Sequence, residues 1–515
     1  MKLLPTGISS FSQLRSRNAV YVDKTPLLYR LMTEGKYYFL SRPRRFGKSL
    51  TLSTLAEIYA GHKALFEGLW IADKWDWGKV HPVIQLSFNG MDYKNQSLKA
   101  AIVERMHEIA ASHGLQLRSE FPPGLFRELI QALAAQQGQV VILIDEYDKP
   151  LTDFLQKEDL PRAYENRDTL RDFYGVVKDL DDEIEFFFMT GVSKFSQVNL
   201  FSQLNNLTDI SLSPRYATLT GYTQAELEGN FGEWIDPLAE RQPGLAREEL
   251  LASIKRWYDG YSFDGLRHVY NPFSILLFLP DGIFQDHWFR TGTPLFLINL
   301  LKEQEFFVLN NLQVHVSVFD SFDLERIEPK ALLFQTGYLT VKSIDWDTRL
   351  CVLDYPNREV EEALHNHLIA ALLDRFSVES AIPVHNIRQA FLADDLPRVI
   401  EIIDSLLADL PYHLFKGKKE HFYHALVHLH FRYLGLYMDS EVSTSRGRID
   451  AVAQTPERIY VLEFKADESA DAALAQIAEK GYADKYRHIG KPIVAVGINF
   501  DTEQKKVGDW RAQAL

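Results

Sequence analysis

One apolar run constrains the fold of this chain more than any other feature of its sequence. The run is continuous and lies at Val140-Val-Ile-Leu-Ile144. It lacks the polar alternation of a strand with one face in water, so it fits a central strand of a parallel sheet covered by helices on both faces. Two carboxylates, Asp145 and Glu146, follow directly. We therefore expect an α/β domain with acidic side chains at one strand end.

Strands and helices alternate over the first 220 residues. The remaining strands are expected at 36–41, 83–88, 184–189 and 215–219, and helices over about 48–60 and from about 97. This alternation predicts a parallel sheet with helices on both faces. We assign residues 1–222 to this domain.

The rest of the chain changes its pattern twice. Residues 223–345 are expected to be a helical region, whose stretch 331–340 is compatible with a small winged-helix unit, and residues 346–410 a helical connector. Residues 411–515 predict a compact core with the order α-β-β-β-α-β. Its expected elements are helices at 420–433 and 470–486 and strands at 436–443, 448–454, 458–465 and 492–499.

Composition and charge restrict the class of protein. At 515 residues the chain is too long for one core. Its formal net charge is −14, yet residues 411–515 hold 15 Lys/Arg against 14 Asp/Glu, while the preceding residues hold 41 against 56. Any contact with a polyanion is therefore expected in the C-terminal part or in a local basic cluster.

Features that would place the chain in a membrane or an oxidising compartment are missing from the sequence. Cys351 is the single cysteine, which excludes an intramolecular disulfide and a Cys-based zinc site. No apolar run approaches the ~18 residues that span a bilayer, and the start has no uninterrupted apolar segment of a secretory signal. We expect a cytoplasmic protein without membrane partners.

A phosphate-binding loop is predicted between the first strand and the following helix, at Arg42-Pro-Arg-Arg-Phe-Gly-Lys-Ser49. Gly47 would let the backbone approach the phosphates closely. Lys48 would meet the β- and γ-phosphates, and the Ser49 hydroxyl would bind Mg²⁺. The common template has a glycine where this chain has Arg42. The loop predicts ATP as a cofactor.

The carboxylates after the apolar run complete this prediction. Asp145 would hold the water shell of the Mg²⁺ ion, and Glu146 would orient and deprotonate the attacking water. A separation of roughly a hundred residues suits a sheet that brings both strand ends to one edge. The alternative is that both carboxylates only cap a strand. Thr190 and Ser193, after the fourth strand, either sense the γ-phosphate or form an ordinary turn.

Four segments of this region resemble the bacterial AAA-ATPase-like family over about residues 4–281. They are Tyr21-Val-Asp-Lys-Thr25, Arg42-Pro-Arg-Arg-Phe-Gly-Lys-Ser-Leu50, Ile144-Asp-Glu-Tyr-Asp-Lys-Pro150 and Thr190-Gly-Val-Ser193. The resemblance makes Arg42 a family trait. It implies that the nucleotide-binding segment includes Arg44, Arg45, Phe46 and Leu50, with the two arginines either contacting phosphate or forming a basic surface. The sequence does not reveal the role of Asp23 and Lys24.

A second candidate site combines two carboxylates with a lysine. Glu463 and Lys465 are two apart on a predicted strand and share a face, and a tight turn would put Asp450 within reach on the neighbouring strand. Carboxylate oxygens suit Mg²⁺ or Mn²⁺, and the lysine would orient or deprotonate a water. This set predicts metal-dependent phosphodiester cleavage. The alternative is an exposed hairpin with scattered charges.

The order of elements around these residues resembles the PD-(D/E)XK nuclease superfamily over about residues 414–500. The resemblance implies a metal-supporting role for Glu420 and a catalytic role for Gln476, which lies with Tyr482 on the following helix. Glu441 is a weaker candidate, and Ile449 stands where the superfamily often has proline.

A zinc site is a competing prediction for the same region. It would use side chains spaced along one predicted helix, namely His421, His424 and His428. The glutamate of the H-E-x-x-H motif is absent, and a partly buried helix face explains these residues equally well.

Together these features predict an ATPase joined to a Mg²⁺- or Mn²⁺-dependent nuclease, with the helical middle transmitting conformational change. The expected partner is nucleic acid, with DNA the favoured form, in DNA processing or genome defence. Assembly into a homo-oligomer through the ATPase domain is compatible with this prediction. The alternative function is an NTP-driven signalling switch whose nuclease-like domain only binds nucleic acid or protein.

Overall fold

The structure is a computed structural model of the 515-residue chain. It describes residues 2–194, 206–241, 246–289, 295–304, 306–307, 309–320, 327–373, 381–408, 429–430, 451–504 and 506–515. The chain forms two compact units, one of residues 1–291 with 309–359 and the other of residues 292–308 with 360–515.

The first unit contains a five-stranded parallel sheet with the order β2-β3-β4-β1-β5. Its strands are β1 (Tyr37–Ser41), β2 (Val83–Ser87), β3 (Val140–Asp145), β4 (Ile184–Gly191) and β5 (Thr208–Asp209). The predicted α/β fold is confirmed. Because β4 lies between β1 and β3, the ends of all three strands meet at one edge of the sheet.

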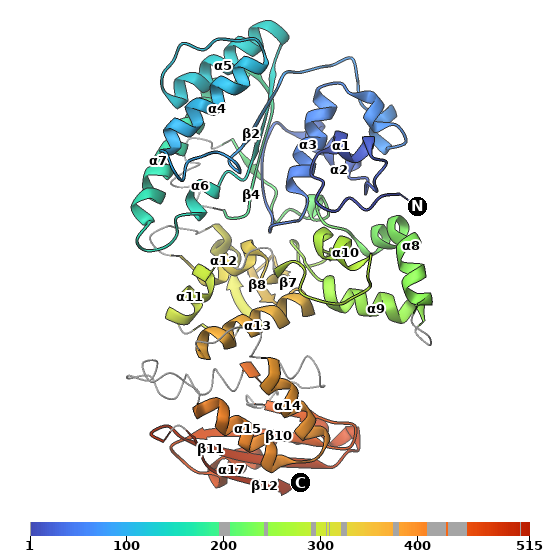
Figure 1. Ribbon diagram of the computed structural model, residues 1–515, viewed down its shortest axis with the longest axis vertical. Coiled ribbons are helices and arrows are strands. Elements are labelled where there is room, and N and C mark those ends of the chain that lie inside the picture. The colour runs from blue at the N-terminus through green and yellow to red at the C-terminus, as the bar shows by residue number, and fades with distance from the viewer. Residues whose placement is uncertain are drawn as a thin grey trace. The chain divides into compact units, whose positions relative to one another are not determined.

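Helices cover both faces of this sheet, as Figure 1 shows. On one side lie α1 (Phe11–Ser16), α2 (Thr25–Glu34) and α3 (Lys48–Tyr59). On the other lie α4 (Leu98–Ser112), α5 (Pro122–Gln137) and α7 (Leu160–Asp179), and the short α6 (Lys149–Thr152) follows β3. Every residue of β3 except Asp145 is buried, which explains its continuous apolar sequence.

The predicted strand at 215–219 is wrong. Residues Pro214–Tyr216 form a 3₁₀ turn, and the fifth strand is the two-residue β5, which pairs with Tyr38 and Phe39 of β1. Pro214 donates no backbone hydrogen bond and fits the first turn of a helix, so it favours the turn over a strand.

The middle of the chain is helical, as predicted, and ends in a small sheet. Thr223 opens α8 with a capping box that includes Glu226. The elements of this region are α8 (Gln224–Glu240), α9 (Arg247–Tyr258), α10 (Pro272–Phe278), β6 (Leu312–His315), α12 (Pro329–Thr336), β7 (Thr340–Asp345) and β8 (Leu350–Asp354). Helix α12 is followed by the antiparallel hairpin β7–β8, and a winged-helix unit here stays a prediction. The boundaries at 222, 345 and 410 stay predictions, although β7 and β8 pair across position 345.

The second unit contains a mixed sheet with the order β12-β11-β10-β9. Strands β10 and β11 are parallel, whereas β9 and β12 pair antiparallel at the edges. The elements are α11 (Leu295–Glu303), α13 (Arg358–Leu373), α14 (Ala381–Leu392), α15 (Leu396–Ala408), β9 (Ala451–Gln454), β10 (Ile459–Ala466), α17 (Ala470–Lys480), β11 (Ile493–Asp501) and β12 (Lys506–Ala514). Helix α13 starts at the boundary between the units.

This sheet matches the predicted C-terminal order in β9, β10, α17 and β11. The helix predicted at 470–486 is shorter in the structure, because α17 ends at Lys480 with Gly481 as its C-cap. Residues Asp484–Ile489 form a 3₁₀ turn. Strand β12 is an additional strand that the sequence did not predict. Of the predicted helix at 420–433, only residues 429 and 430 are described, and both are helical. The predicted strand at 436–443 lies outside the described residues.

Candidate active sites

The phosphate-binding loop has the predicted place between β1 and α3. Gly47 adopts a left-handed conformation with φ of 90° immediately before Lys48, the first residue of α3. Glycine adopts such a φ without steric strain. The backbone N–H groups in the first turn of α3 have no partner within the helix and remain available to bind an anion. Phe46 anchors the loop to the protein interior. Its side chain is buried, and the centres of the Phe46 and Tyr261 rings are 4.8 Å apart. Leu50 is half-buried in the first turn of α3.

Lys48 is buried and lies against its own loop. Its ammonium group donates hydrogen bonds to the carbonyl oxygens of Arg42, at 2.9 Å, and Pro43, at 3.0 Å. Burial lowers the pKa of Lys48, and nearby carboxylates, first that of Asp145, act in the opposite direction. The Lys48 ammonium group therefore lies close enough to Asp145 to interact with its charge.

Asp145 joins the loop to the fourth strand. The Ser49 hydroxyl donates a hydrogen bond of 2.5 Å to one carboxylate oxygen of Asp145, and the Thr190 hydroxyl donates one of 2.7 Å to the other. These three residues are far apart in sequence and meet because β4 lies between β1 and β3. The hydroxyl of Ser49 and the carboxylate of Asp145 are hard oxygen donors, and this pair fits Mg²⁺.

Glu146 occupies a strained position beside this pair. Its φ of 52° is left-handed, and its backbone N–H donates to the Asp145 carboxylate at 3.1 Å. Burial, followed by the charge of Asp145, raises the pKa of the Glu146 carboxyl. Strained backbone and a raised carboxyl pKa both occur at catalytic sites and suit a general base.

The three arginines of the loop differ in environment. Arg42 is buried, donates to the carbonyl oxygens of Ser41 and Ser211, and stacks on the ring of Phe263 at 3.7 Å. It therefore supports the loop from inside. Arg44 is exposed, and Arg45 is exposed with its guanidinium 4.9 Å from the ring centre of Phe273. Contact of these two arginines with phosphate stays a prediction.

The second candidate site lies on β10 and α17. The side-chain amide of Gln476 donates to Glu463, and its oxygen accepts a 2.6 Å hydrogen bond from the Lys465 ammonium. The same amide lies 3.4 Å from the Tyr482 hydroxyl. Glu463 is buried and Lys465 half-buried on the same face of β10. The structure thus brings together Glu463, Lys465 and Gln476, as the sequence predicted.

Several residues predicted for this site lie outside the described residues, namely Glu420, Asp450, Glu441, His421, His424 and His428. Asp450 directly precedes Ala451, which pairs with Leu462, the chain neighbour of Glu463. Among the described residues no group of three or more His, Cys, Asp or Glu side chains could hold a metal ion. The metal-binding roles of Asp450, Glu463 and Glu420 stay predictions.

Comparisons with known proteins match the two regions of the chain that contain these candidate sites. Residues 5–201 match the family described as predicted AAA-ATPase, and residues 418–510 match the PD-(D/E)XK nuclease superfamily. The chain is an AAA-ATPase-like protein with a PD-(D/E)XK nuclease superfamily domain. It belongs to the same family as an uncharacterized protein in the vnfD 5′ region of Azotobacter chroococcum mcd 1. The two are 40% identical over 531 residues, which cover 100% of this chain and 99% of that one.

Solved structures give more distant similarities. The ORC2 protein of Aeropyrum pernix, solved as ADPNP–ADP complexes, is 12% identical with a TM-score of 0.26, covering 68% of this chain and 92% of its own. The ORC1 protein of Aeropyrum pernix in complex with DNA is 14% identical with a TM-score of 0.21, covering 71% and 93%. At these TM-scores the similarity carries no further conclusion.

The family motif around Asp23 and Lys24 has a structural role in this AAA-ATPase-like protein. The Asp23 carboxylate accepts from the Thr25 backbone at the start of α2 and from the Trp70 backbone. The Lys24 ammonium is 2.7 Å from the carboxylate of Glu226, the residue that completes the capping box of α8. The motif therefore ties the N-terminal segment to the first helix of the middle region.

Asp148 was not predicted, although it lies three residues after Asp145. Its buried carboxylate accepts hydrogen bonds from the backbone N–H groups of Val192 and Ser193. The signal in the sequence is the third acidic residue of Asp145-Glu-Tyr-Asp148, but its partners lie more than forty residues away. Spacing alone could not connect them.

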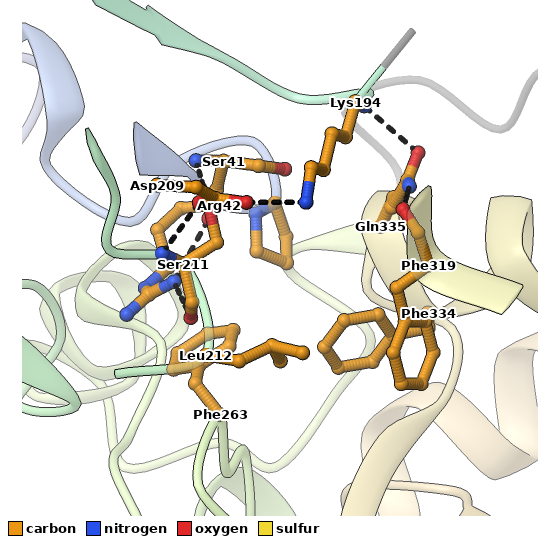
Figure 2. A pocket seen from close by; sticks show the side chains of 11 residues that line it. Ser41, Arg42, Lys194, Asp209, Ser211, Leu212, Phe263, Phe319, Phe334 and Gln335 are labelled. Atoms are coloured by element: carbon orange, nitrogen blue, oxygen red, sulfur yellow. Dashed lines mark hydrogen bonds and ion pairs between the residues drawn. The ribbon is translucent and has the colours of Figure 1, made fainter. Parts of the chain in front are cut away.

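A small cavity lies beside the loop in the AAA-ATPase-like unit, and Figure 2 shows its lining. Lys194 forms an ion pair with Asp209, and the backbone N–H of Lys194 donates to the Gln335 side chain at 3.0 Å. The opposite wall is apolar and includes Phe319 and Phe334. With about 20 Å³ the cavity accommodates roughly one water molecule. It is too small to be the nucleotide site.

Within the described ranges, no helix has both the length and the apolar character needed to cross a bilayer.

Proposed function

We propose that this protein hydrolyses ATP in its N-terminal domain and cleaves nucleic-acid phosphodiesters in its C-terminal domain, with Mg²⁺ or Mn²⁺ at both sites. The observation that carries the ATPase is the meeting of Ser49, Asp145 and Thr190 at one sheet edge, with Glu146 beside them. Sequence similarity to the AAA-ATPase family and to the nuclease superfamily supports the two-part proposal.

For ATP hydrolysis, Lys48 must leave the carbonyl oxygens of Arg42 and Pro43 and turn its ammonium group to the β- and γ-phosphates. A bound Mg²⁺ would polarise the phosphate oxygens. Ser49 and Asp145 are the side chains that would hold it. Glu146 takes a proton from the attacking water, and its raised pKa makes the carboxylate a stronger base than a solvated glutamate.

For phosphodiester cleavage, Glu463 and Asp450 would hold the metal, with Glu420 in support. A bound divalent metal would lower the pKa of the attacking water. Lys465 orients or deprotonates that water. Gln476 contacts both Glu463 and Lys465, so it fixes the distance between the metal-binding carboxylate and the ammonium group.

The wider setting belongs to the same proposal. The substrate is nucleic acid, with DNA the favoured form, because the C-terminal domain belongs to a nuclease superfamily. DNA processing or genome defence, a cytoplasmic location and a homo-oligomer assembled through the ATPase domain are predictions that follow from the sequence.

The test uses the purified full-length chain. Release of phosphate from ATP is followed for the wild type, and degradation is followed on labelled single- and double-stranded DNA and RNA in Mg²⁺, Mn²⁺ and EDTA. We expect ATP hydrolysis and metal-dependent cleavage of at least one substrate. ATP hydrolysis without cleavage of any substrate would favour the NTP-driven switch instead, and absence of ATP hydrolysis would contradict the first half of the proposal.

A further inference from the structure

The last two residues of β4 and the two residues that follow it, 190–193, are held by both neighbouring strands, and we name this segment the β4 turn. On the β1 side, the backbone N–H of Arg42 donates to the carbonyl oxygen of Gly191 at 3.1 Å. On the β3 side, the backbone N–H of Tyr147 donates to the carbonyl oxygen of Thr190 at 3.1 Å. The turn therefore spans the gap between the phosphate-binding loop and the catalytic carboxylates.

The Asp148 carboxylate accepts hydrogen bonds from two backbone N–H groups of this turn. One carboxylate oxygen accepts from the backbone N–H of Ser193 at 2.6 Å and from that of Val192 at 3.1 Å. The side chain is only 2% exposed. Burying a carboxylate costs desolvation free energy unless the group is hydrogen-bonded. The N–H groups of Val192 and Ser193 offset this cost for Asp148. The Asp148 carboxylate and the β4 turn are thus fixed to each other.

Gly191 permits this close approach. A Cβ atom at this position would lie 2.6 Å from the ring of Tyr147 and 2.7 Å from a carboxylate oxygen of Asp148. Any larger residue would push the turn away from Asp148. The glycine in the Thr190-Gly-Val-Ser193 motif is therefore explained by packing against the segment that follows Glu146.

The Ser193 hydroxyl lies on the segment that Asp148 holds. Ser193 is 1% exposed, and its hydroxyl has no hydrogen-bond partner among the residues that the structure describes. Its carbonyl oxygen, in contrast, accepts from the Tyr147 hydroxyl at 2.9 Å. Buried hydroxyl groups nearly always have a partner, so this one points to a missing polar group. A phosphate oxygen or its attacking water would satisfy it.

We propose that Asp148 is a positioning residue for ATP hydrolysis, which holds the β4 turn so that the Ser193 hydroxyl meets the γ-phosphate or the attacking water. The inference rests on the proposed ATPase function. Asp148 acts on the reaction through the backbone N–H groups of Val192 and Ser193. The turn continues into Lys194, which contacts Asp209 and Gln335 as Figure 2 shows, so its far end is fixed as well.

The first test is Asp148→Asn in the full-length chain. Asparagine keeps the shape, but its uncharged oxygen accepts more weakly than a carboxylate oxygen, and its NH₂ group takes the place of the oxygen that also accepts from the Val192 N–H at 3.2 Å. We expect kcat for ATP to fall roughly 10–100-fold, because small misplacement of a reacting group costs that much. The Kd for ATP, measured by calorimetry with the hydrolysis-deficient Glu146→Gln background, should stay within about threefold, because phosphate binding by the loop is intact.

The matched control is Asp153→Asn. Asp148 is the N-cap residue of the short helix α6, and Asp153 is its C-cap residue. Asp153 accepts from Tyr93 and Lys149, and among the described residues no hydrogen bond or ion pair joins it to the β4 turn. We expect kcat close to that of the wild type. An equal loss of kcat in both variants would mean that the segment is merely loosened, and it would overturn the positioning role.

A second variant, Ser193→Ala, removes the hydroxyl without disturbing the carboxylate, and it serves even if Asp148→Asn fails to fold. Its kcat should fall to a similar extent, and the double variant should fall no further, because both changes remove one interaction. Wild-type kcat in Ser193→Ala, or losses that multiply, would overturn the inference. A wild-type protein without ATPase activity overturns the proposed function as well, whereas an active wild type with an active Asp148→Asn overturns this inference alone.

Discussion

At the scale of single residues, Glu146 is the most direct test of the ATPase site. Glu146→Gln keeps the side-chain volume but removes the base, so hydrolysis should fall about 10²–10⁴-fold while ATP binding stays nearly intact. Lys48→Ala should instead weaken ATP binding. Phosphate release and calorimetric binding separate the two effects. A Glu146→Gln variant that hydrolyses ATP at the wild-type rate would show that another group is the base.

The pH dependence of hydrolysis provides a second check on the same residue. A general base works only when deprotonated, so the rate is lost as the pH falls through its pKa. Because burial and Asp145 raise the pKa of Glu146, this loss should begin at a higher pH than for a glutamate with the ordinary value of about 4.3. The slow residual rate of Glu146→Gln should lack this acid limb.

Residue identity predicted one part of the proposed ATPase site and missed another. Ser49, Asp145 and Thr190 were predictable because each follows a recognisable strand or loop motif, and parallel strands bring their ends together. Asp148 and Arg42 were not, because their partners are backbone groups of Val192, Ser193 and Ser211. Almost every residue has the same backbone N–H and C=O groups, so residue identity does not indicate which of them binds a side chain. These two roles are therefore seen only in the folded chain.

At the scale of elements, Gly497 on β11 determines how closely α17 packs on the second sheet. A Cβ atom there would lie 2.3 Å from the carbonyl oxygen of Ala470, the first residue of the helix. Gly497→Ala should therefore destabilise this unit by about 1–3 kcal/mol and reduce cleavage, with ATP hydrolysis unchanged. Gly508→Ala on β12, where the nearest atom is at 3.4 Å, is the control. Equal thermal melts for the two variants would contradict the packing argument.

Glu359, in the first turn of α13, predicts a dependence of stability on pH. Its buried carboxyl accepts from the Trp288 backbone and the Ser274 hydroxyl, and burial raises its pKa to about 8. The folded state therefore holds a proton that the unfolded state loses above its ordinary pKa of about 4.3. Stability contributed by this proton is present at low pH and lost as the pH rises toward 8.

The measurement is the melting temperature of the wild type and Glu359→Gln between pH 5 and 9. The melting temperature of the variant relative to that of the wild type should increase with pH over this window and level off above about pH 8. Parallel curves for the two proteins would contradict a raised pKa. Loss of the folded transition in the variant at every pH would show that the charged carboxylate is required.

Two errors in the predicted elements have a common physical cause. Both β5 and β12 are edge strands, and β5 has only two residues. Strand β12 is mostly exposed and contains charged residues and Gly508, so it lacks the apolar run of a buried strand. Central strands such as β3 and β10 were predictable because burial on both faces requires an apolar sequence.

At the scale of the whole molecule, an AAA-ATPase-like domain and a nuclease-superfamily domain on one chain predict that nucleotide affects cleavage. This requires that ATP bind two conformations with different affinity. Cleavage rates should therefore differ between the nucleotide-free, ADP-bound and non-hydrolysable-analogue states, and Lys48→Ala should lose this difference. Identical rates in all three states would show that the domains act independently.

The central claim, that the chain carries a working nuclease alongside an ATPase, is tested most directly by one comparison. Mg²⁺-dependent cleavage of the best nucleic-acid substrate is measured for the wild type, Lys465→Ala and the exposed control Lys480→Ala, with ATP hydrolysis recorded on the same preparations. We expect Lys465→Ala to lose cleavage by about 100-fold or more while hydrolysing ATP normally, and Lys480→Ala to match the wild type. Equal cleavage by the wild type and Lys465→Ala would contradict the proposed site.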